Sequence, residues 1–155
     1  MQKTADFIEN RIKWRASQHN LPNSSVFLFD NLTADKKAKY LNHFNQEDYG
    51  KIILLFTDSK NNWTALGTKK IIGYDGTKVN SVKLNSIQNV DSKNRKEYFE
   101  KAEAGETKLK KFKKRNESEL LVTEIDGKET IFITEKGSDL FSLWNIMIMI
   151  TRLNK

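Results

Sequence analysis

The alternation of apolar stretches and turn residues predicts a run of short strands in the middle of the chain. Between Trp63 and Leu84, apolar stretches are separated by turn residues, and the clearest joint is Asp75-Gly76. A type I′ turn requires positive φ at both central residues, which an Asp-Gly pair adopts at low cost, so this dipeptide is a strong hairpin signal. We therefore expect an antiparallel meander here, around which the other elements are arranged.

The same pattern continues on both sides and extends the prediction to seven strands. A second Asp-Gly pair, Asp126-Gly127, predicts a further type I′ hairpin. Consecutive strands with short turns and no helical crossovers favour antiparallel pairing in sequence order, and such a sheet curls and needs a cover for its apolar face. The expected strands are Lys51 to Phe56, Trp63 to Leu66, Lys70 to Tyr74, Thr77 to Leu84, Ile87 to Val90, Leu120 to Ile125 and Thr130 to Thr134.

Helical spacing of apolar residues predicts helices at both ends of the chain. Thr4 is a suitable N-cap for the first helix, and Pro22 ends it because the residue before a proline avoids the helical region. Its apolar stripe is formed by Phe7, Ile8, Ile12 and Trp14. Residues 25–29 fit either a strand or a turn of helix. The expected helices cover residues 4–17, Thr33 to Phe44, and Ser138 or Asp139 to about Leu153.

The last of these helices is apolar on nearly every side. One wide stripe suits a helix that covers the inner face of the sheet: Leu140, Leu143, Trp144, Met147, Ile150 and Leu153. Apolar residues outside that stripe must meet the N-terminal helices or another chain, so a homodimer is one possible outcome. The candidate interface residues are Phe141, Ile148 and Met149.

Length and composition bound the class of protein. At 155 residues the chain forms one domain, or one domain with a helical arm, and it has no cysteines for disulfides or a thiolate zinc site. Its first residues lack the apolar run of a signal peptide, and no stretch approaches the ~20 apolar residues of a membrane span. We therefore expect a cytoplasmic protein that does not cross a membrane. Its richness in Lys, Asn and Ile is typical of an AT-rich bacterial genome.

No pattern of residues predicts catalysis. The sequence lacks a glycine-rich phosphate loop, a His-Glu-x-x-His zinc motif and a nucleophile elbow. Its two histidines, His19 and His43, lie far apart and have no metal-ligand spacing around them. We therefore expect no enzyme activity, no cofactor and no metal. We also expect Trp14, Trp63 and Trp144 to lie in the core.

Positive charge is concentrated in one segment of the chain. The net charge is +7, and residues 93–115 alone hold ten Lys or Arg against four Glu, a net +6. Asn94 to Glu100 fits a short helix with i,i+4 ion pairs, so the charge gathers after Gly105. The candidate residues for an anionic partner are Lys108, Lys110, Lys111, Phe112, Lys113, Lys114 and Arg115.

Four interpretations of this basic segment stay open. It is a solvated loop, or it binds anionic lipid headgroups, an acidic protein partner or nucleic acid. On an anionic membrane each basic residue contributes ~1 kcal/mol, and Phe112 would insert at the interface. Nucleic acid is disfavoured because the rest of the chain is close to neutral and shows no basic stripe.

Several residues carry a resemblance to a known superfold. They are Thr68-Lys69-Lys70 before the apolar strand Ile71-Ile72, then Ser86 to Val90, and the closing strands and helix from Leu120 to Leu153. In these features the chain resembles the pleckstrin-homology-like (PH-like) superfold, and within it the bacterial PH and GRAM-like modules. The resemblance covers about residues 50–153. It implies an α+β fold: an antiparallel seven-stranded curled sheet or barrel, capped by the C-terminal helix.

Two segments depart from this superfold. The N-terminal helical arm, residues 1–49, precedes the PH-like domain at 50–155, and the basic insertion at 93–118 interrupts it. PH-like modules are mostly binding domains, although a fold does not fix a function. The resemblance therefore implies a non-catalytic binding module for a protein partner or an anionic surface. The alternative is an immunity-type inhibitor that neutralises a partner toxin, a role that small, catalytically blank bacterial chains often serve.

Overall fold

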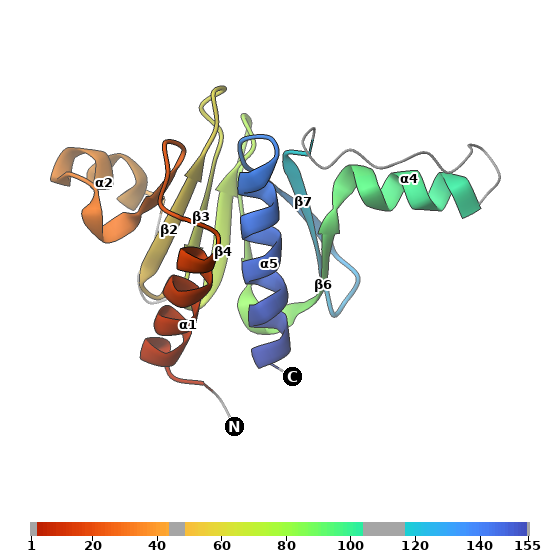
Figure 1. Ribbon diagram of the computed structural model, residues 1–155, viewed down its shortest axis with the longest axis horizontal. Helices are drawn as coiled ribbons and strands as arrows, with labels where there is room; N and C mark the ends of the chain where they lie inside the picture. Colours follow the sequence, from red (N-terminus) through yellow and green to blue (C-terminus); the bar gives the residue numbers. More distant parts are fainter. Residues whose placement is uncertain (1–2, 44–48, 104–116, 155) are drawn as a thin grey trace.

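The computed structural model describes residues 3–43, 49–103 and 117–154 and has an α+β fold (Figure 1). The elements follow the sequence prediction closely in type and position. Their bounds are α1 Ala5–Gln18, β1 Val26–Leu28, η1 Phe29–Asn31, α2 Ala34–Leu41, β2 Ile52–Thr57, β3 Trp63–Gly67, β4 Lys70–Tyr74, β5 Val79–Lys83, η2 Leu84–Ser86, β6 Ile87–Ser92, α4 Lys93–Glu103, β7 Glu119–Glu124, β8 Glu129–Ile133 and α5 Ser138–Leu153.

The strands form two antiparallel sheets. The first sheet has the order β1-β2-β3-β4-β5 and the second β6-β7-β8, so neighbouring strands pair in sequence order within each sheet, as predicted. The sequence predicted one curled sheet or barrel of seven strands, and this prediction is corrected: the described strands form two sheets, of five and three strands, and no ladder among them joins β5 to β6 or β8 to β1. The chain passes through the 3₁₀ turn η2 between β5 and β6, which carries β6 into the second sheet.

The two sheets pack together through β8. This strand lies against β3, β4 and β5 of the first sheet. The hydroxyl of Thr64 in β3 donates a hydrogen bond to the backbone oxygen of Ile133 in β8, at 2.8 Å. Gly73 in β4 leaves room for the ring of Phe132, because a Cβ atom at position 73 would lie 2.8 Å from it. The two sheets are therefore joined by the Thr64 hydrogen bond and the Gly73–Phe132 contact. A barrel would have a ladder of backbone hydrogen bonds instead.

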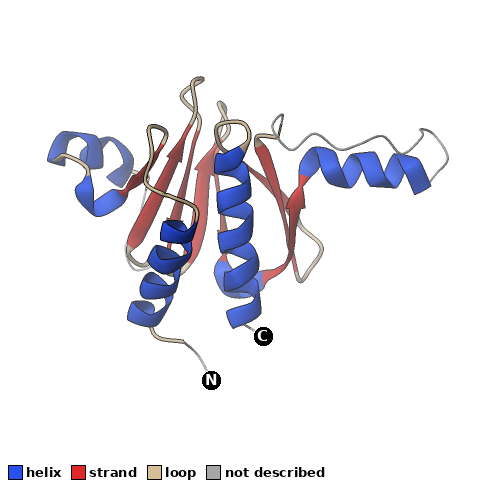
Figure 2. Cartoon of the chain, viewed as in Figure 1, coloured by secondary structure: helices blue, strands red, loops and turns tan. Residues whose placement is uncertain are grey.

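Helices α1 and α5 lie side by side across one face of the sheets (Figures 1 and 2). The main core lies beneath them, and Ile12, Leu143 and Met147 are fully buried in it. α5 covers the sheets as the sequence predicts. For α1 the predicted apolar stripe is partly wrong: Ile8 and Ile12 are buried, but Phe7 and Trp14 point outward and are 39% and 44% exposed.

Residues before position 50 contribute a strand to the first sheet. Of the two possibilities for residues 25–29, the structure has a strand, β1, followed by the 3₁₀ turn η1. β1 pairs antiparallel with β2, with Val26 opposite Phe56. α2 and η1 lie against the opposite face of this sheet. A second apolar cluster there contains Trp63, whose ring contacts Tyr40 edge-on at 5.6 Å.

Both predicted hairpins form, but with other turns than type I′. β4 and β5 flank Asp75-Gly76, and β7 and β8 flank Asp126-Gly127. In each pair only the glycine has positive φ, +99° at Gly76 and +92° at Gly127. Asp75 instead uses its carboxylate, which accepts hydrogen bonds from the backbone N–H groups of Thr77 and Lys78, both at 3.0 Å. This side-chain capping stabilises a longer loop.

Helix α4 extends away from the body of the molecule (Figure 1). It agrees with the short helix predicted from Asn94. β6 and β7, which precede and follow this excursion, pair directly, with Ser92 opposite Leu120. The hydroxyl of Ser92 donates to the buried carboxylate of Glu117 at 2.7 Å, and Lys93 pairs with Glu119 at 3.3 Å. The chain that leaves β6 into α4 and the chain that enters β7 are therefore joined by a hydrogen bond and an ion pair.

Candidate binding groove between α4 and α5

A groove of about 380 Å³ lies where the first turn of α4, strand β6 and the outward side of α5 meet. Its size lies within the range of pockets that bind ligands or side chains. We call it the α4–α5 groove. Its lining residues are Asn89, Val90, Asp91, Arg95, Phe141, Trp144 and Ile148.

One wall of the groove is apolar and comes from a single helix. Phe141, Trp144 and Ile148 lie on the same side of α5, because they are spaced by three and four residues. All three are half-buried. The rings of Phe141 and Trp144 lie 5.4 Å apart, centroid to centroid, and tilted by 34°. The wall thus offers an aromatic and aliphatic surface held on a rigid element.

The charged side of the groove comes from the end of β6 and the start of α4. The Nη1 atom of Arg95 donates to both carboxylate oxygens of Asp91, each at 3.2 Å. This i,i+4 pair keeps the guanidinium of Arg95 6.0 Å from the centre of the Trp144 ring. A cation next to an indole face is attracted by the ring quadrupole. The groove therefore combines apolar contact with one oriented cation.

Trp144 has an unusual hydrogen-bonding state. Its Nε1–H group is buried and finds no acceptor among the described residues. A buried donor without an acceptor costs ~1–3 kcal/mol relative to a satisfied one. Such groups are rare in folded proteins and call for a specific reason.

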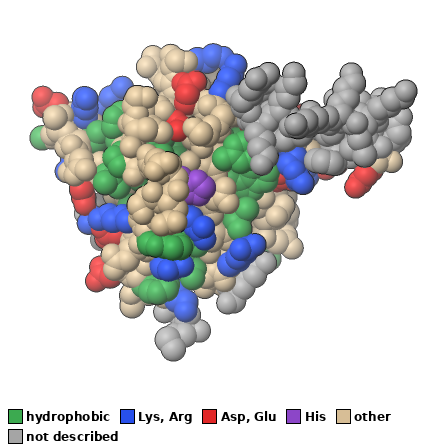
Figure 3. All heavy atoms as spheres, viewed as in Figure 1, with side chains coloured by type: hydrophobic (Ala, Val, Ile, Leu, Met, Phe, Trp, Pro, Cys, Tyr) green, Lys and Arg blue, Asp and Glu red, His purple; other side chains and the backbone are tan. Residues whose placement is uncertain are grey.

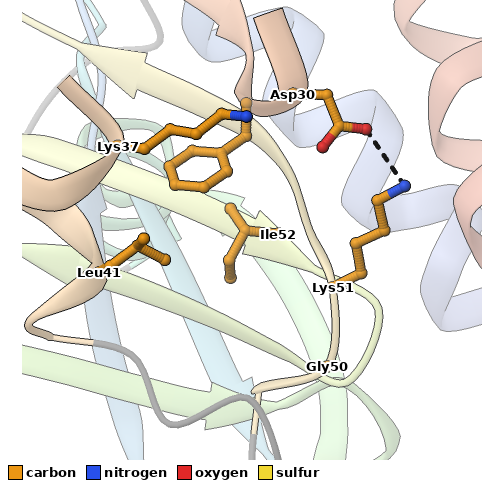
Figure 4. A pocket seen from close by; sticks show the side chains of 7 residues that line it. Asp30, Lys37, Leu41, Gly50, Lys51 and Ile52 are labelled. Carbon is orange, nitrogen blue, oxygen red and sulfur yellow. Dashed lines mark ion pairs between the residues drawn. The ribbon is translucent and has the colours of Figure 1, made fainter. Parts of the chain in front are cut away.

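A second, larger cavity of about 530 Å³ lies between α2, η1 and the start of β2 (Figure 4). Phe29, Leu41 and Ile52 form its apolar side. Its charged residues include Lys51, whose Nζ pairs with Asp30 at 3.1 Å and with Glu9 at 3.0 Å. These two carboxylates neutralise the positive charge of Lys51. The attraction of Lys51 for an external anion is therefore weaker.

The ion pairs around Lys51 shift the ionisation of their members. Hydrogen bonds from Lys13 and Lys51 lower the pKa of Glu9 below its ordinary value. Hydrogen bonds to Glu9 and Asp30 raise the pKa of Lys51. Both groups are therefore charged at neutral pH. Sequence reasoning missed this network because its members come from α1, η1 and the chain just before β2, and only the fold brings them together.

The predicted interface residues have different positions. Phe141 and Ile148 lie in the wall of the α4–α5 groove. Met149 is 6% exposed and belongs to the main core, because it lies on the side of α5 that faces the sheets. The predicted residues for an anionic partner lie outside the described residues: Lys108, Lys110, Lys111, Phe112, Lys113, Lys114 and Arg115.

The tryptophans and histidines also occupy distinct sites. Trp63 is in the core as predicted, Trp144 is half-buried in the groove wall, and Trp14 is exposed. His19 follows α1, where burial and the nearby Arg15 lower its pKa. His43 contacts the Trp63 ring at 5.4 Å on the other face of the first sheet. The described residues contain no group of three or more His, Cys, Asp or Glu side chains arranged to hold a metal ion.

Comparison with known proteins gives no relative: no family model, curated protein or solved structure matches this chain. Among the described helices, none is both long and apolar enough to cross a bilayer.

Proposed function

We propose that this chain is a non-catalytic binding module of the bacterial PH-like type, and that a protein partner binds it in the α4–α5 groove. The order of elements supports the PH-like assignment, since neighbouring strands pair antiparallel in sequence order within each sheet and α5 comes last. A binding module with this order of elements needs no catalytic group. The observation that carries the proposal is the state of Trp144: the residue lines the groove, and its indole N–H is buried without an acceptor among the described residues.

An apolar side chain with a nearby oxygen acceptor fits this groove best. Phe141, Trp144 and Ile148 would contact the apolar part, and aromatic residues together with arginine dominate the energetics of protein interfaces. The Nε1 atom of Trp144 is covered in the free chain, so an acceptor reaches it when side chains at the rim rotate. A backbone carbonyl or carboxylate of the partner would then accept from this N–H and lie near Arg95. Binding would remove the cost of the unsatisfied donor.

The basic segment supports a second mode of contact with an anionic surface. Its six positive charges between Lys108 and Arg115 are a property of the sequence. The hydrogen bond between Ser92 and Glu117 joins the chain on the two sides of this segment. It supports the view that the segment can bind without disturbing the sheets. We propose that charge in this segment strengthens the same association when the partner is acidic.

The proposal is tested by photocrosslinking in cells that express the chain at its native level. A photoreactive phenylalanine analogue is placed at Ile148 in the groove. The matched control has it at Ile125, which is apolar and 69% exposed in the turn after β7. We expect one crosslinked protein from position 148 that is absent from position 125. Mass spectrometry of that band identifies the partner, which is then purified for direct titration.

Each outcome of the crosslinking bears on the proposal. A band from both positions, or from neither, contradicts a partner in the α4–α5 groove. If the captured protein is a toxin domain whose activity the purified chain abolishes, the immunity-type alternative is correct. If it is a protein of another class, the binding-module proposal stands.

A further inference from the structure

The outward face of α1 and the residue just before its N-cap carry a row of cations and aromatic rings. Its members are Lys3, Phe7, Arg11, Trp14 and Arg15, which we call the α1 stripe. The Nζ of Lys3 lies 5.5 Å from the centre of the Phe7 ring. The guanidinium carbons of Arg11 and Arg15 lie 4.6 Å and 5.1 Å from the Trp14 ring, so two arginines contact one exposed indole. Green and blue side chains alternate over α1 in Figure 3.

The cations of this stripe have no carboxylate partner within the described residues. Lys3, Arg11 and Arg15 form no ion pair with any described residue, including Asp6 in the first turn. The neighbouring lysines behave differently: Lys13 and Lys51 both pair with Glu9, at 2.6 Å and 3.0 Å. Positive charge is thus neutralised on one flank of α1 and left uncompensated on the stripe.

The two arginines are held in place by the indole. Their Nε atoms are buried and have no hydrogen-bond acceptor among the described residues. Stacking on an aromatic ring suits the planar, weakly hydrated guanidinium, which also binds phosphate oxygens in a fork geometry. The Trp14 ring therefore orients both guanidinium groups, and because their Nε atoms are covered, the terminal nitrogens are the donors that would contact an external anion.

The helix that carries the stripe is fixed to the body of the protein. Ile8, Ile12 and Ala16 on the opposite side are buried, and α1 packs against α5. Thr4 caps the helix, its hydroxyl accepting from the N–H of Phe7 at 3.1 Å. Because the helix is formed before any contact, binding through the stripe requires little ordering of the chain.

The position and charge of the stripe favour a bilayer as its partner. The stripe lies on the outward side of a surface helix, where Phe7 and Trp14 are exposed, and no stripe residue lines the α4–α5 groove or the cavity beside α2. A bilayer accepts such a helix face without a matching groove. Trp and Phe favour the boundary between headgroups and acyl chains, and Lys and Arg contact the headgroups of anionic lipids.

We propose that the α1 stripe docks this protein on an anionic lipid bilayer, with Phe7 and Trp14 entering the interface and Lys3, Arg11 and Arg15 contacting lipid phosphates. The net charge of +7 attracts the chain to such a surface over a longer range. This surface is separate from the α4–α5 groove, and its function does not depend on a partner in that groove.

The test is vesicle co-sedimentation of the full chain. The probes are vesicles of equal parts phosphatidylcholine and phosphatidylglycerol, with pure phosphatidylcholine as the neutral reference. We expect binding to the anionic vesicles that weakens between low salt and about 0.15 M salt. An Arg11→Gln/Arg15→Gln variant should bind roughly 30-fold more weakly, since each basic residue strengthens such binding roughly fivefold. Lys60→Gln/Lys128→Gln removes the same charge from two exposed turns and should bind nearly as the wild type does.

Two further variants separate the stripe from folding and from the basic segment. Arg11→Lys/Arg15→Lys keeps the charge and should retain most of the binding, which a merely structural role of the arginines would not predict. Trp14→Phe should bind but lose the blue shift in fluorescence that the anionic vesicles cause. Equal binding of the two double Gln variants, or no binding of the wild type to the anionic vesicles, overturns the proposal. So does complete loss of binding in a Lys110, Lys111, Lys113 and Lys114 to Ser variant while Arg11→Gln/Arg15→Gln still binds.

Discussion

The side-chain amide of Asn23 donates a hydrogen bond to the buried carboxylate of Asp139, at 2.8 Å and across 116 positions of sequence. The hydroxyl of Ser25 donates to the other oxygen of the same carboxylate. Asp139 lies in the first turn of α5 and is 4% exposed. These bonds fasten the start of the last helix to the loop before β1. The N-terminal segment and the last helix therefore support one another.

Replacing Asp139 with alanine should lower the free energy of unfolding by about 3 kcal/mol, because the donors of Asn23 and Ser25 lose their buried acceptor. Urea denaturation measures the change. Asp35→Ala is the matched control, since it also removes an acidic residue from a helical first turn, but at an exposed position. Equal losses for the two variants would mean that Asp139 acts only through the helix dipole.

Adding a methyl group at Gly73 should destabilise the contact between the sheets. The new Cβ would meet the Phe132 ring at 2.8 Å and Thr64 Oγ1 at 3.3 Å. We expect Gly73→Ala to cost about 2 kcal/mol, the usual range for overpacking a core. Phe132→Leu should relieve the clash, so the double variant should be more stable than the sum of the single losses predicts. Additive losses in thermal or urea unfolding would contradict the contact.

Neighbouring positions on α5 should differ in their effect on stability. Leu143 is fully buried, so Leu143→Ala should cost about 3 kcal/mol by loss of packing. Trp144 is half-buried: it packs against the edge of the core and also lines the groove, so Trp144→Ala should cost less, about 1 kcal/mol. Urea unfolding of both variants makes the comparison. A larger loss for Trp144→Ala would place the indole in the core and weaken the argument for a binding role.

Asp75 should contribute stability that disappears in acid. Backbone hydrogen bonds from Lys78 and Thr77 and the Thr77 hydroxyl lower the pKa of Asp75 from 3.8 to about 2. A folded pKa below the unfolded one means that the contribution is present above about pH 4 and is lost as the pH falls toward 2. Asp75→Asn should therefore be less stable than the wild type at pH 7. That gap, small because solvent screens an exposed carboxylate, should close by pH 2.

The carboxyl resonance of Asp75, followed by NMR during an acid titration, checks the cause directly. A midpoint near the ordinary value of 3.8, or a stability gap that persists unchanged at pH 2, would contradict the role of these hydrogen bonds.

Local patterns in the sequence were sufficient to predict most elements. The Asp-Gly pairs located both hairpins, because a turn is encoded by the residues within it. The turn type differed, since the carboxylate of Asp75 captures backbone N–H groups and forms a longer loop. Closure of the sheet depends on contacts between distant strands. The Thr64 and Gly73 contacts with β8 decide it, and no local pattern contains them.

The candidate sites were predicted less well, for a related reason. Helical spacing identifies which residues share a face, but it does not say which face meets the core. On α1 the buried residues are Ile8, Ile12 and Ala16, and Phe7 and Trp14 are exposed. On α5 Met149 is buried in the core. The groove itself was beyond prediction from sequence, because it depends on the place where α4 leaves β6 beside α5.

The most direct test of the central claim is the affinity between the purified chain and the partner captured from position 148. Isothermal titration calorimetry should compare the wild type with Ile148→Glu, which buries a charge in the groove, and with Ile125→Glu, which places the same charge on an exposed turn. We predict roughly a 100-fold or greater loss of affinity for Ile148→Glu, as for a charge inserted into an interface core, and little change for Ile125→Glu. Equal affinities for all three proteins would contradict partner binding in the α4–α5 groove.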